Sequence, residues 1–433
     1  MSALFLSLAL TACGHSETEE EYNLDYTHPL AEGEKICGRS DFNTLFPYSL
    51  RSSTLPVLVH YYKKGEEETA RQVLAAVEKG WDFHVNQLGM REPLKDGGEC
   101  GPDDAFDVFV WKGHRSCLVD VLSGNPDTVW DDRRGYMIVD AWGPYGGPEL
   151  EETVVHEMAH ASQAADDWYE APHTFEMSAV FTDQIFADRY IKTYLDDFQA
   201  RPDLSIDYND DYETWYMYGS SLYLLYLKDR YYGGDARFVS EMWLRSRNPP
   251  DASEDPSLNE PDFADALDVM LQAKANTNYV ESVPGFARWR WYTGEHMDDR
   301  HFRLKNGVEN LRAAKLTLAA QKEARPGEIS IRDNAPMMLG TSYIALTRPA
   351  GAANIVQVSL SAPEADGRRF VVQAVPGLTP DSDGETLDLS SGAAQVTFAA
   401  DGTRTLIVTV LPTGTYDPDT RGDGRYPFTL TLR

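Results

Sequence analysis

Basic residues are scarce in this sequence of 433 residues. It has 39 Lys and Arg against 69 Asp and Glu, so its formal net charge at pH 7 is −30. Proteins that bind nucleic acid neutralise the phosphates with clustered Lys and Arg. We therefore expect no nucleic acid partner, and we attribute the acidity to solubility in an extracellular setting.

The sequence also lacks a hydrophobic run long enough to span a bilayer. The apolar stretch 4–10 is too short for this, and Thr11-Ala12-Cys13-Gly14 follows it. Although no Lys or Arg precedes the stretch, it resembles the signal peptide and lipobox of bacterial lipoproteins. The resemblance implies that residues 1–12 are removed and that Cys13 carries a lipid. Residues 13–34, acidic and poor in apolar side chains, are then a flexible tether, and only the lipid anchor contacts a membrane.

Cysteine is rare, with four in the chain. No C-x-x-C pair exists, so we do not expect zinc bound by cysteines. If Cys13 carries lipid, three cysteines remain, and at most one disulfide can form within a monomer. Cys100 and Cys117 flank a strand-like segment and could be joined across a hairpin. Cys37 could instead pair with either of them.

The chain length and the pattern of apolar and polar residues predict two domains. A chain of 433 residues is too long for one ordinary core. Up to about residue 325, helical periods alternate with strand-like runs, which predicts an α+β fold with a mixed sheet, an active-site helix and a helical subdomain. The predicted strands are 55–62, 106–111 and 136–142, and the predicted helices are 66–88, 150–166, 174–198, 216–231 and 263–275.

After about residue 335 the pattern changes to short alternating runs separated by turn residues such as Asp366-Gly367 and Asp401-Gly402. Regular short strands of this kind predict an antiparallel β-sandwich over 335–433. Its strands are expected at 342–347, 354–360, 370–374, 395–399, 405–411 and 427–432. The catalytic domain is expected over 35–325.

The motif His156-Glu157-Met158-Ala159-His160 lies in the middle of a predicted buried helix. Histidines four apart project from one face, so both imidazoles can reach one ion. Glu157 can then accept a proton from a water on that ion, which makes it the candidate general base. This predicts one Zn²⁺ bound by His156 and His160. The strand upstream, 135–142, is where an edge strand could pair with an extended peptide.

A catalytic zinc usually takes a third protein ligand. Glu176 is one candidate, because a short loop between two antiparallel helices would bring it back to the ion. Asp166 is the alternative, at the spacing that metzincins use. Gln163, however, stands where metzincins have a glycine, and Met217, which could imitate their Met-turn, lies where a helix is expected.

The histidine motif followed by Glu176-x-x-Ala179 resembles the gluzincin peptidases, whose third ligand is a glutamate on the next helix. Several stretches also resemble a group of metalloprotease-like secreted lipoproteins of myxobacteria, over most of residues 36–433. The stretches are 153–163, 218–222 through 232–234, 286–289 with 293–294, and 339–343. The resemblance implies zinc, Glu157 as the base and Glu176 as the third ligand.

Two further roles are expected around such a centre. An oxyanion that develops during attack on a carbonyl needs a stabilising donor, for which Tyr218 is the first candidate and Tyr216 the second. Asp183 lies on the same helical face as Glu176 and could either orient a zinc-bound histidine or point into solvent.

Two other patterns have ordinary explanations. The turn 381–384 resembles a fragment of a calcium loop, but the later bidentate glutamate is missing, which favours a plain turn. The aromatic cluster 289–292 could form a binding platform, although a core cluster is the simpler interpretation.

The predicted function is zinc-dependent hydrolysis of a peptide or protein substrate on the cell envelope. Two alternatives stay open: an inactive scaffold lipoprotein with the same fold, and a hydrolase acting on a non-peptide carbonyl. No single-sequence pattern specifies the substrate.

Overall fold

The structure of the protein, a computed structural model, describes residues 37, 45–112, 116–124, 128–142, 149–210, 212–248, 259–363, 367–379, 381–419 and 422–433. The predicted signal peptide 1–12, the tether 13–34 and the lipidated Cys13 lie outside these residues. Among the helices of the described segments, none combines the length and the apolar content that crossing a bilayer requires.

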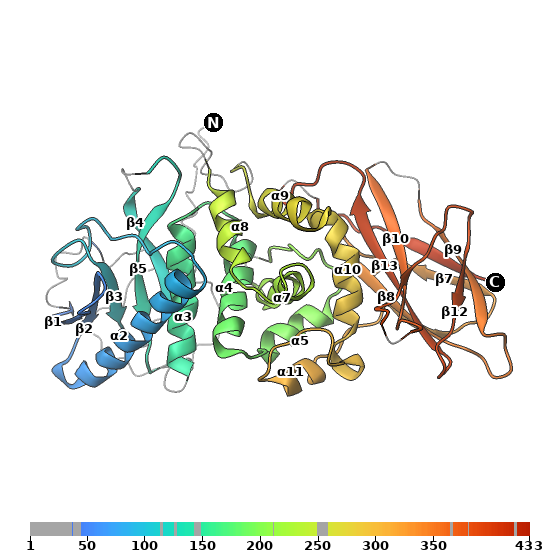
Figure 1. The fold of residues 1–433 in the computed structure, drawn as a ribbon, viewed down its shortest axis with the longest axis horizontal. Helices are drawn as coiled ribbons and strands as arrows, with labels where there is room; N and C mark the ends of the chain where they lie inside the picture. Colours follow the sequence, from blue (N-terminus) through green and yellow to red (C-terminus); the bar gives the residue numbers. More distant parts are fainter. Residues whose placement is uncertain are drawn as a thin grey trace. The chain divides into compact units, whose positions relative to one another are not determined.

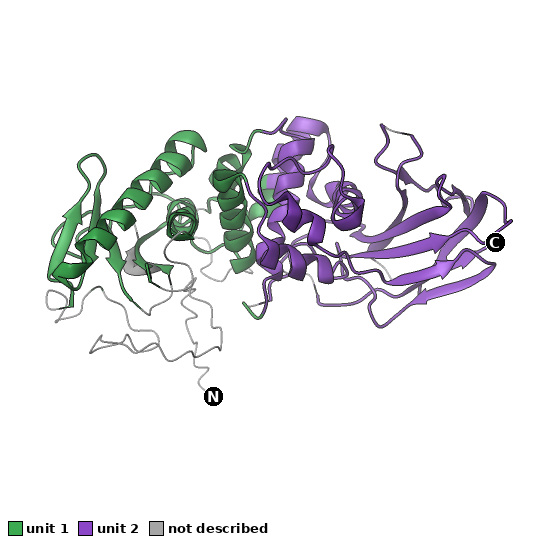
Figure 2. Ribbon diagram, turned by 90° about the horizontal axis from the view of Figure 1, so that it is seen from below, with its two compact units in different colours: residues 1–188, 211–213, 235–266 green, residues 189–210, 214–234, 267–433 purple. Residues whose placement is uncertain are grey.

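The chain divides into two compact units (Figure 2). Unit 1 comprises residues 1–188, 211–213 and 235–266, and unit 2 comprises residues 189–210, 214–234 and 267–433. The fold class is α+β, as predicted: a mixed sheet, a helical middle region and C-terminal sheets that are largely antiparallel. The domain bounds 35–325 and 335–433 stay a prediction.

Unit 1 is built on a mixed sheet of five strands in the order β1-β2-β3-β5-β4 (Figure 1). The strands are β1 Tyr48–Arg51, β2 Val57–Tyr61, β3 Phe106–Val110, β4 Cys117–Gly124 and β5 Arg133–Val139. β2, β3 and β5 are parallel, and the edge strands β1 and β4 are antiparallel to their neighbours. β5 is therefore paired on both sides, so the expectation of an open edge near 135–142 was wrong; β4, which was not predicted, is the edge strand.

Helices α2 (Glu67–Trp81) and α3 (Leu150–Ala164) pack against each other and against this sheet. Gly80 allows the close approach, since a Cβ there would lie 3.2 Å from Met158 Cγ on α3. The turn η1 (Lys64–Glu66) precedes α2, and the π-helical turn η2 (Asp82–Gln87) follows it. In η2, the buried His84 places its Nε2 2.9 Å from the Val155 carbonyl of α3. α3 is thus held at two points along its length.

The predicted helix 174–198 is two helices, α4 (Pro172–Ala187) and α5 (Lys192–Ala200). Pro172 begins α4, where its missing N–H costs nothing. Asp188 ends it in the left-handed conformation, with φ 47°. At this break the chain passes from unit 1 to unit 2. Unit 1 also contains α8 (Phe238–Ser246) and the first residues of α9 (Phe263–Ala275), and the rest of α9 belongs to unit 2.

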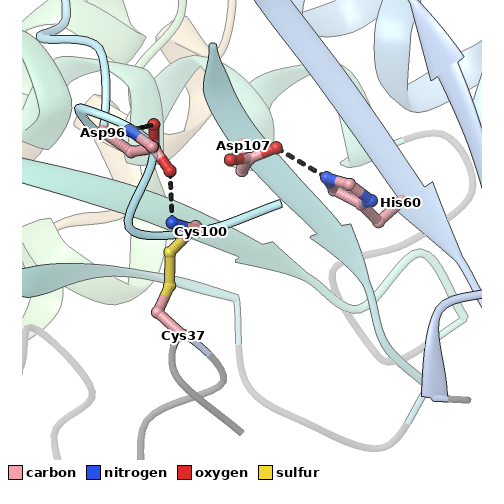
Figure 3. Close-up of a disulfide and its surroundings, with 6 residues drawn as sticks. Cys37, His60, Asp96, Cys100 and Asp107 are labelled. Atoms are coloured by element: carbon pink, nitrogen blue, oxygen red, sulfur yellow. Dashed lines mark hydrogen bonds and ion pairs between the residues drawn. A yellow bond between two sulfur atoms is a disulfide. The ribbon is translucent and has the colours of Figure 1, made fainter. Parts of the chain in front are cut away.

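A disulfide joins Cys37 to Cys100 (Figure 3). The hairpin that would have paired Cys100 with Cys117 does not form, because β5 lies between β3 and β4. Beside the disulfide, Asp96 accepts hydrogen bonds from the backbone N–H groups of Gly98 and Cys100. Asp107 on β3 meets His60 on β2, with Oδ1 2.6 Å from Nε2 (Figure 3).

Unit 2 begins with helices and ends in a β-sandwich. Its helices are α5, α6 (Tyr216–Gly219), α7 (Ser221–Arg230), α10 (Tyr279–Trp291), the turn η5 (Gly294–His296) and α11 (Val308–Ala313). α10 packs on β10 and β13 of the sandwich, where Trp291 and Tyr292 join Tyr343, Val375 and Ile407 in an apolar cluster. The aromatic segment 289–292 is therefore core rather than a binding platform, since Trp289, Trp291 and Tyr292 are all buried.

The sandwich has the sheets β11-β10-β13-β8-β6 and β12-β9-β14-β7. The strands are β6 Ala320–Glu323, β7 Gly327–Ile331, β8 Thr341–Thr347, β9 Ile355–Ser361, β10 Arg368–Val375, β11 Glu385–Thr386, β12 Ala394–Thr397, β13 Thr403–Pro412 and β14 Phe428–Leu432. Apolar side chains from both sheets fill one core. One pairing is not antiparallel: β6 runs parallel to β8, because the chain crosses to the other sheet as β7 before it returns as β8.

Candidate metal centre

α3 carries both histidines of the motif on a helix that is buried along most of its length. Glu151 and Glu152 lie in its first turn, where acidic side chains stabilise a helix N-terminus. Small residues at Ala159 and Ala161 let the helix pack closely. His160 is 1% exposed and the side chain of His156 is 15% exposed, so one side of the pair remains accessible.

Glu176 on α4 meets the two histidines. Its Oε2 lies 3.2 Å from His156 Nε2 and 3.6 Å from His160 Nε2, and the two Nε2 atoms are 3.2 Å apart. Ligands about 2.0–2.1 Å from a tetrahedral zinc lie about 3.3 Å from one another. The three residues form a buried group that could hold a metal ion, and the spacing of their atoms fits zinc.

The Nδ1 atom of each imidazole, on the side away from Glu176, faces a hydrogen-bond acceptor. His156 Nδ1 lies 2.8 Å from Asp183 Oδ2, and His160 Nδ1 lies 2.8 Å from Gln163 Oε1. A carboxylate only accepts. The Gln163 amide is oriented by its Nε2, which donates to the Phe175 carbonyl at 3.1 Å, so its oxygen must face His160. Both Nδ1 atoms are therefore protonated.

With both protons on Nδ1, the two Nε2 atoms present lone pairs to each other and to Glu176. Glu176 Oε2 is buried and accepts no hydrogen bond from a donor in the part of the chain that the structure describes. Three lone pairs facing one another repel unless a cation lies between them. The donor set, two imidazole nitrogens and one carboxylate oxygen, is one that zinc accepts.

The pKa values of His156 and Glu176 also indicate that positive charge is stabilised at this centre. Burial alone would lower the pKa of His156, but Asp183 and then Glu176 raise it well above its ordinary value. Burial alone would raise the pKa of Glu176, yet the facing imidazoles lower it to about 2. The centre therefore favours bound cations, whether protons or a metal.

Glu157 lies beside this group on α3 and is also buried. Burial raises the pKa of its carboxyl, and the charges of His156 and His160 oppose that rise. No hydrogen bond from another described residue occupies it. Its carboxylate is thus in a position to exchange a proton.

Asp166, the alternative third ligand, does not join the group. It lies beyond the end of α3, where its Oδ1 accepts from Arg247 Nε at 2.8 Å. Met217 is part of the helix α6 rather than a Met-turn. The metzincin pattern is therefore not what the structure contains.

The two tyrosine candidates belong to unit 2. Tyr218 packs against Tyr194 and Trp215, with ring centroids 5.2 and 5.1 Å away. Tyr216 is fully buried, and its hydroxyl faces the carbonyls of Leu204 and Ser205 at 3.2 and 2.9 Å. The role of Tyr218 stays a prediction, and Tyr216 is accounted for by these backbone contacts.

Sequence reasoning missed the support behind His160. Gln163 donates to Ser178 Oγ at 2.8 Å, and Ser178 also accepts from Trp243 Nε1 at 3.1 Å. The only sequence signal was that Gln163 lies three residues after His160, on the same helical face. Its partners come from α4 and α8, which no local pattern could bring together.

The turn 381–384 is a plain turn, as favoured. Ser382 Oγ donates to the Gly384 carbonyl at 3.0 Å, and Asp383 Oδ1 lies 3.1 Å from His301 Nε2.

Comparison with known proteins gives little. No family model matches the chain, and no curated protein matches it. Among solved structures, the C-terminal part is similar to the pre-peptidase C-terminal domain of a collagenase from Bacillus anthracis. The identity is 13% over 27% of this chain and 97% of that chain, with a TM-score of 0.18. A likeness this weak says nothing of activity.

Proposed function

We propose that the protein is a zinc metallopeptidase. The observation that carries the proposal is the convergence of His156 Nε2, His160 Nε2 and Glu176 Oε2 at 3.2–3.6 Å. The proton on each imidazole is held on the opposite ring nitrogen by Asp183 or Gln163. When bound, zinc supplies a Lewis acid and lowers the pKa of a water that it holds.

The residues of the chain then divide the work. His156, His160 and Glu176 hold the ion, and Asp183 and Gln163 orient the two rings. Glu157 takes a proton from the attacking water and returns it to the leaving amine. Its raised pKa supports this role, because a base works best when its pKa is near the working pH. Tyr218 is proposed from the sequence alone as the donor to the developing oxyanion.

A peptide substrate needs a place to lie extended. β4 is an edge strand of the unit 1 sheet, and α3 packs against both β4 and β5. No strand of the described residues pairs with the outer edge of β4, and such an edge next to the helix of the histidines suits the addition of an extended peptide as a further strand. This supports a peptide rather than a non-peptide carbonyl as the substrate.

The test compares Glu157→Gln with Glu151→Gln on the same helix. Glu151 is half-exposed and pairs with Lys79 at the surface. Hydrolysis of an internally quenched peptide library should fall by roughly two to four orders of magnitude in Glu157→Gln and stay unchanged in Glu151→Gln. Elemental analysis should find about one zinc per chain in both variants. Zinc without turnover in the wild type would instead indicate the scaffold, and absence of zinc would overturn the metal assignment.

The place of action is proposed from two features. The Cys37–Cys100 disulfide fits an oxidising compartment outside the cytoplasm. The lipid on Cys13 would attach the chain to a membrane of the cell envelope. Release of a Cys13→Ser variant from the membrane fraction would support the anchor, and a wild type that is already soluble would contradict it.

A further inference from the structure

Two pairs of adjacent aspartates in unit 1 interact with each other. Asp131 and Asp132 directly precede β5, and Asp166 and Asp167 directly follow α3. Two of the four have an arginine partner. Asp132 Oδ2 accepts from Arg91 Nη1 at 2.9 Å, and Asp166 pairs with Arg247.

Both arginines are committed to these partners. The guanidinium groups of Arg91 and Arg247 also lie over the Trp130 ring, 4.6 and 4.2 Å from its centroid. Arg91 Nη1 donates in addition to the Ala165 carbonyl, at 2.5 Å. Stacking and pairing together fix each guanidinium at its own aspartate.

Asp131 and Asp167 have hydrogen-bond donors but no arginine partner of this kind; Asp167 Oδ1, for example, accepts from the Tyr169 backbone N–H at 3.0 Å. Neither carboxylate forms an ion pair with a Lys or Arg of the described residues, and the two lie close enough to share a hydrogen bond. Asp167 is fully buried. Two buried carboxylates in contact cannot both be ionised unless a cation lies between them.

Two buried amides complete this cluster. Asn248 Nδ2 lies 3.1 Å from Asp167 Oδ2, and Asn259 Nδ2 lies 2.8 Å from Asp131 Oδ2. Asn248 Nδ2 also donates to Asn259 Oδ1, so the four side chains are in contact. Asn248 is 1% exposed. Two buried oxygens, Asn248 Oδ1 and Asp131 Oδ1, have no donor among the described residues.

We propose that Asp131, Asp167, Asn248 and Asn259 form a calcium site. Two carboxylates balance the charge of one Ca²⁺, and the amides can turn their oxygens to it. Every ligand atom is then an oxygen, which Ca²⁺ prefers. These four side chains include no imidazole or thiolate, which disfavours zinc. Mg²⁺ fits less well, because it keeps several waters and demands octahedral geometry, and this cluster is buried.

The site would stabilise the connection between the two helices of the metal centre. Asp167 lies in the segment 165–171, which joins α3, bearing His160, to α4, bearing Glu176. Asp131 tethers this segment to the start of β5, and Asn248 tethers it to the end of α8. The proposal is independent of the peptidase activity, since it concerns different ligands and a different ion.

A second acidic group in unit 1 offers a matched control. Glu260, Asp262 and Asp265 lie close together, but Glu260 and Asp265 are exposed. Asp262 Oδ1 accepts from the N–H groups of Ala264 and Asp265 at the start of α9, at 2.7 and 2.9 Å. These contacts account for the group as a helix cap with a solvated edge.

The test uses the full chain loaded with zinc. Terbium, which replaces calcium, should luminesce when tryptophan is excited, because Trp130 directly precedes Asp131 in the sequence and can transfer energy to an ion there, and added Ca²⁺ should quench the signal. Calcium at about a hundredfold excess over its dissociation constant should raise the Tm by roughly 5 °C, and Mg²⁺ by less. Asp131→Asn, at the less buried end, should weaken calcium binding by about tenfold or more, and Asp167→Asn likewise. Asp265→Asn should bind calcium as the wild type does.

A shared proton is the competing explanation for the carboxylate pair. In that case calcium would change neither the Tm nor the terbium signal, and Asp131→Asn would unfold at the same or a higher temperature. That result would overturn the proposal. Loss of calcium binding in Asp265→Asn but not in Asp131→Asn would also overturn it, because the ion would then lie at the exposed group. Circular dichroism of each variant separates loss of binding from loss of folding.

Discussion

The buried histidines of unit 1 and unit 2 differ in the partners of their ring nitrogens. In unit 1, Nδ1 of His156 and of His160 faces a hydrogen-bond acceptor, and Nε2 of each faces the other histidine and Glu176. In unit 2, both ring nitrogens of His301 face carboxylates. His301 Nδ1 lies 2.8 and 2.9 Å from the two oxygens of Asp298, and its Nε2 lies 3.1 Å from Asp383. Its ring also stacks on Tyr292, with centroids 4.0 Å apart. Both clusters combine buried imidazole with carboxylate.

The difference lies in the lone pairs that remain. A histidine with both nitrogens occupied holds its neighbours in place and has nothing to offer a metal. Two histidines whose Nδ1 protons are fixed have two Nε2 lone pairs, and these converge with a carboxylate. Burial and composition therefore do not define a metal site; the distribution of protons does. The predictions below test this contrast, starting with the largest expected effect.

His160→Ala should remove bound zinc and peptidase activity together. The change deletes one of three ligands, so the zinc affinity should fall by more than the 10–100-fold loss typical of outer partners. Zinc content after dialysis and peptide hydrolysis measure the two effects. His301→Ala is the matched control and should retain about one zinc per chain. Equal zinc loss in both variants would contradict the contrast.

Asp183→Ala should weaken zinc binding by about 10–100-fold without removing a ligand. The physical reason is that His156 Nδ1 loses the acceptor that fixes its proton. Asp183→Asn should lose less zinc affinity than Asp183→Ala, because its amide oxygen can still accept a hydrogen bond from His156 Nδ1. Titration against a zinc-competing dye gives the affinities. Identical affinities for both variants and the wild type would show that Asp183 has no part in orienting the ring.

His301→Gln should lower the free energy of unfolding by about 1–3 kcal/mol and leave zinc affinity unchanged. The glutamine cannot bond Asp298 and Asp383 in the same geometry, so one of these two partly buried carboxylates loses its partner. Urea denaturation of the variant measures the stability. A change in zinc affinity larger than the experimental error would contradict the assignment of this cluster as purely structural.

His60 is another buried histidine, and its contact with Asp107 predicts a small pH dependence of stability (Figure 3). Burial raises the pKa of Asp107 to about 8 and lowers that of His60 to about 4. Above pH 6.5 the imidazole is neutral in the folded chain and mostly neutral in the unfolded chain, so its own contribution to the pH dependence is small. Asp107 is then protonated only when folded, so stability should fall as the pH rises from 6.5 to 8. Asp107→Asn should reduce this fall by about 1 kcal/mol or more.

The unfolding free energies of the wild type and Asp107→Asn, measured at pH 6.5, 7.25 and 8, test whether stability falls with pH. The slope is the change of unfolding free energy with pH. Asp104→Asn, at an exposed aspartate beside Lys95, is the control and should keep the slope of the wild type. A slope that is unchanged in Asp107→Asn would show that another group titrates in this window.

The local part of the candidate site was predictable from the sequence, and the part that depends on tertiary contacts was not. The spacing of His156 and His160 fixes their common face because a helix has 3.6 residues per turn. Glu176 follows from two helices and a short loop between them. Gln163, Ser178 and Trp243 act together only because α3, α4 and α8 pack against one another, and no period in the chain reports that.

The fold shows the same division. The strands of the sandwich were predictable from alternation, whereas the parallel pairing of β6 with β8 depends on the path of the chain between sheets. β4 was missed although it is the edge of the unit 1 sheet. The single helix expected over 174–198 breaks at Asp188, where the sequence has no glycine or proline to mark the end.

The Cys37–Cys100 bond has a consequence for proteolytic maturation. A cut at any peptide bond between these two cysteines opens the chain but leaves both pieces covalently joined. If the chain is cut within residues 45–99, the product keeps its full mass until a reductant is added. Two bands on a reducing gel and one on a non-reducing gel would reveal such a nicked form.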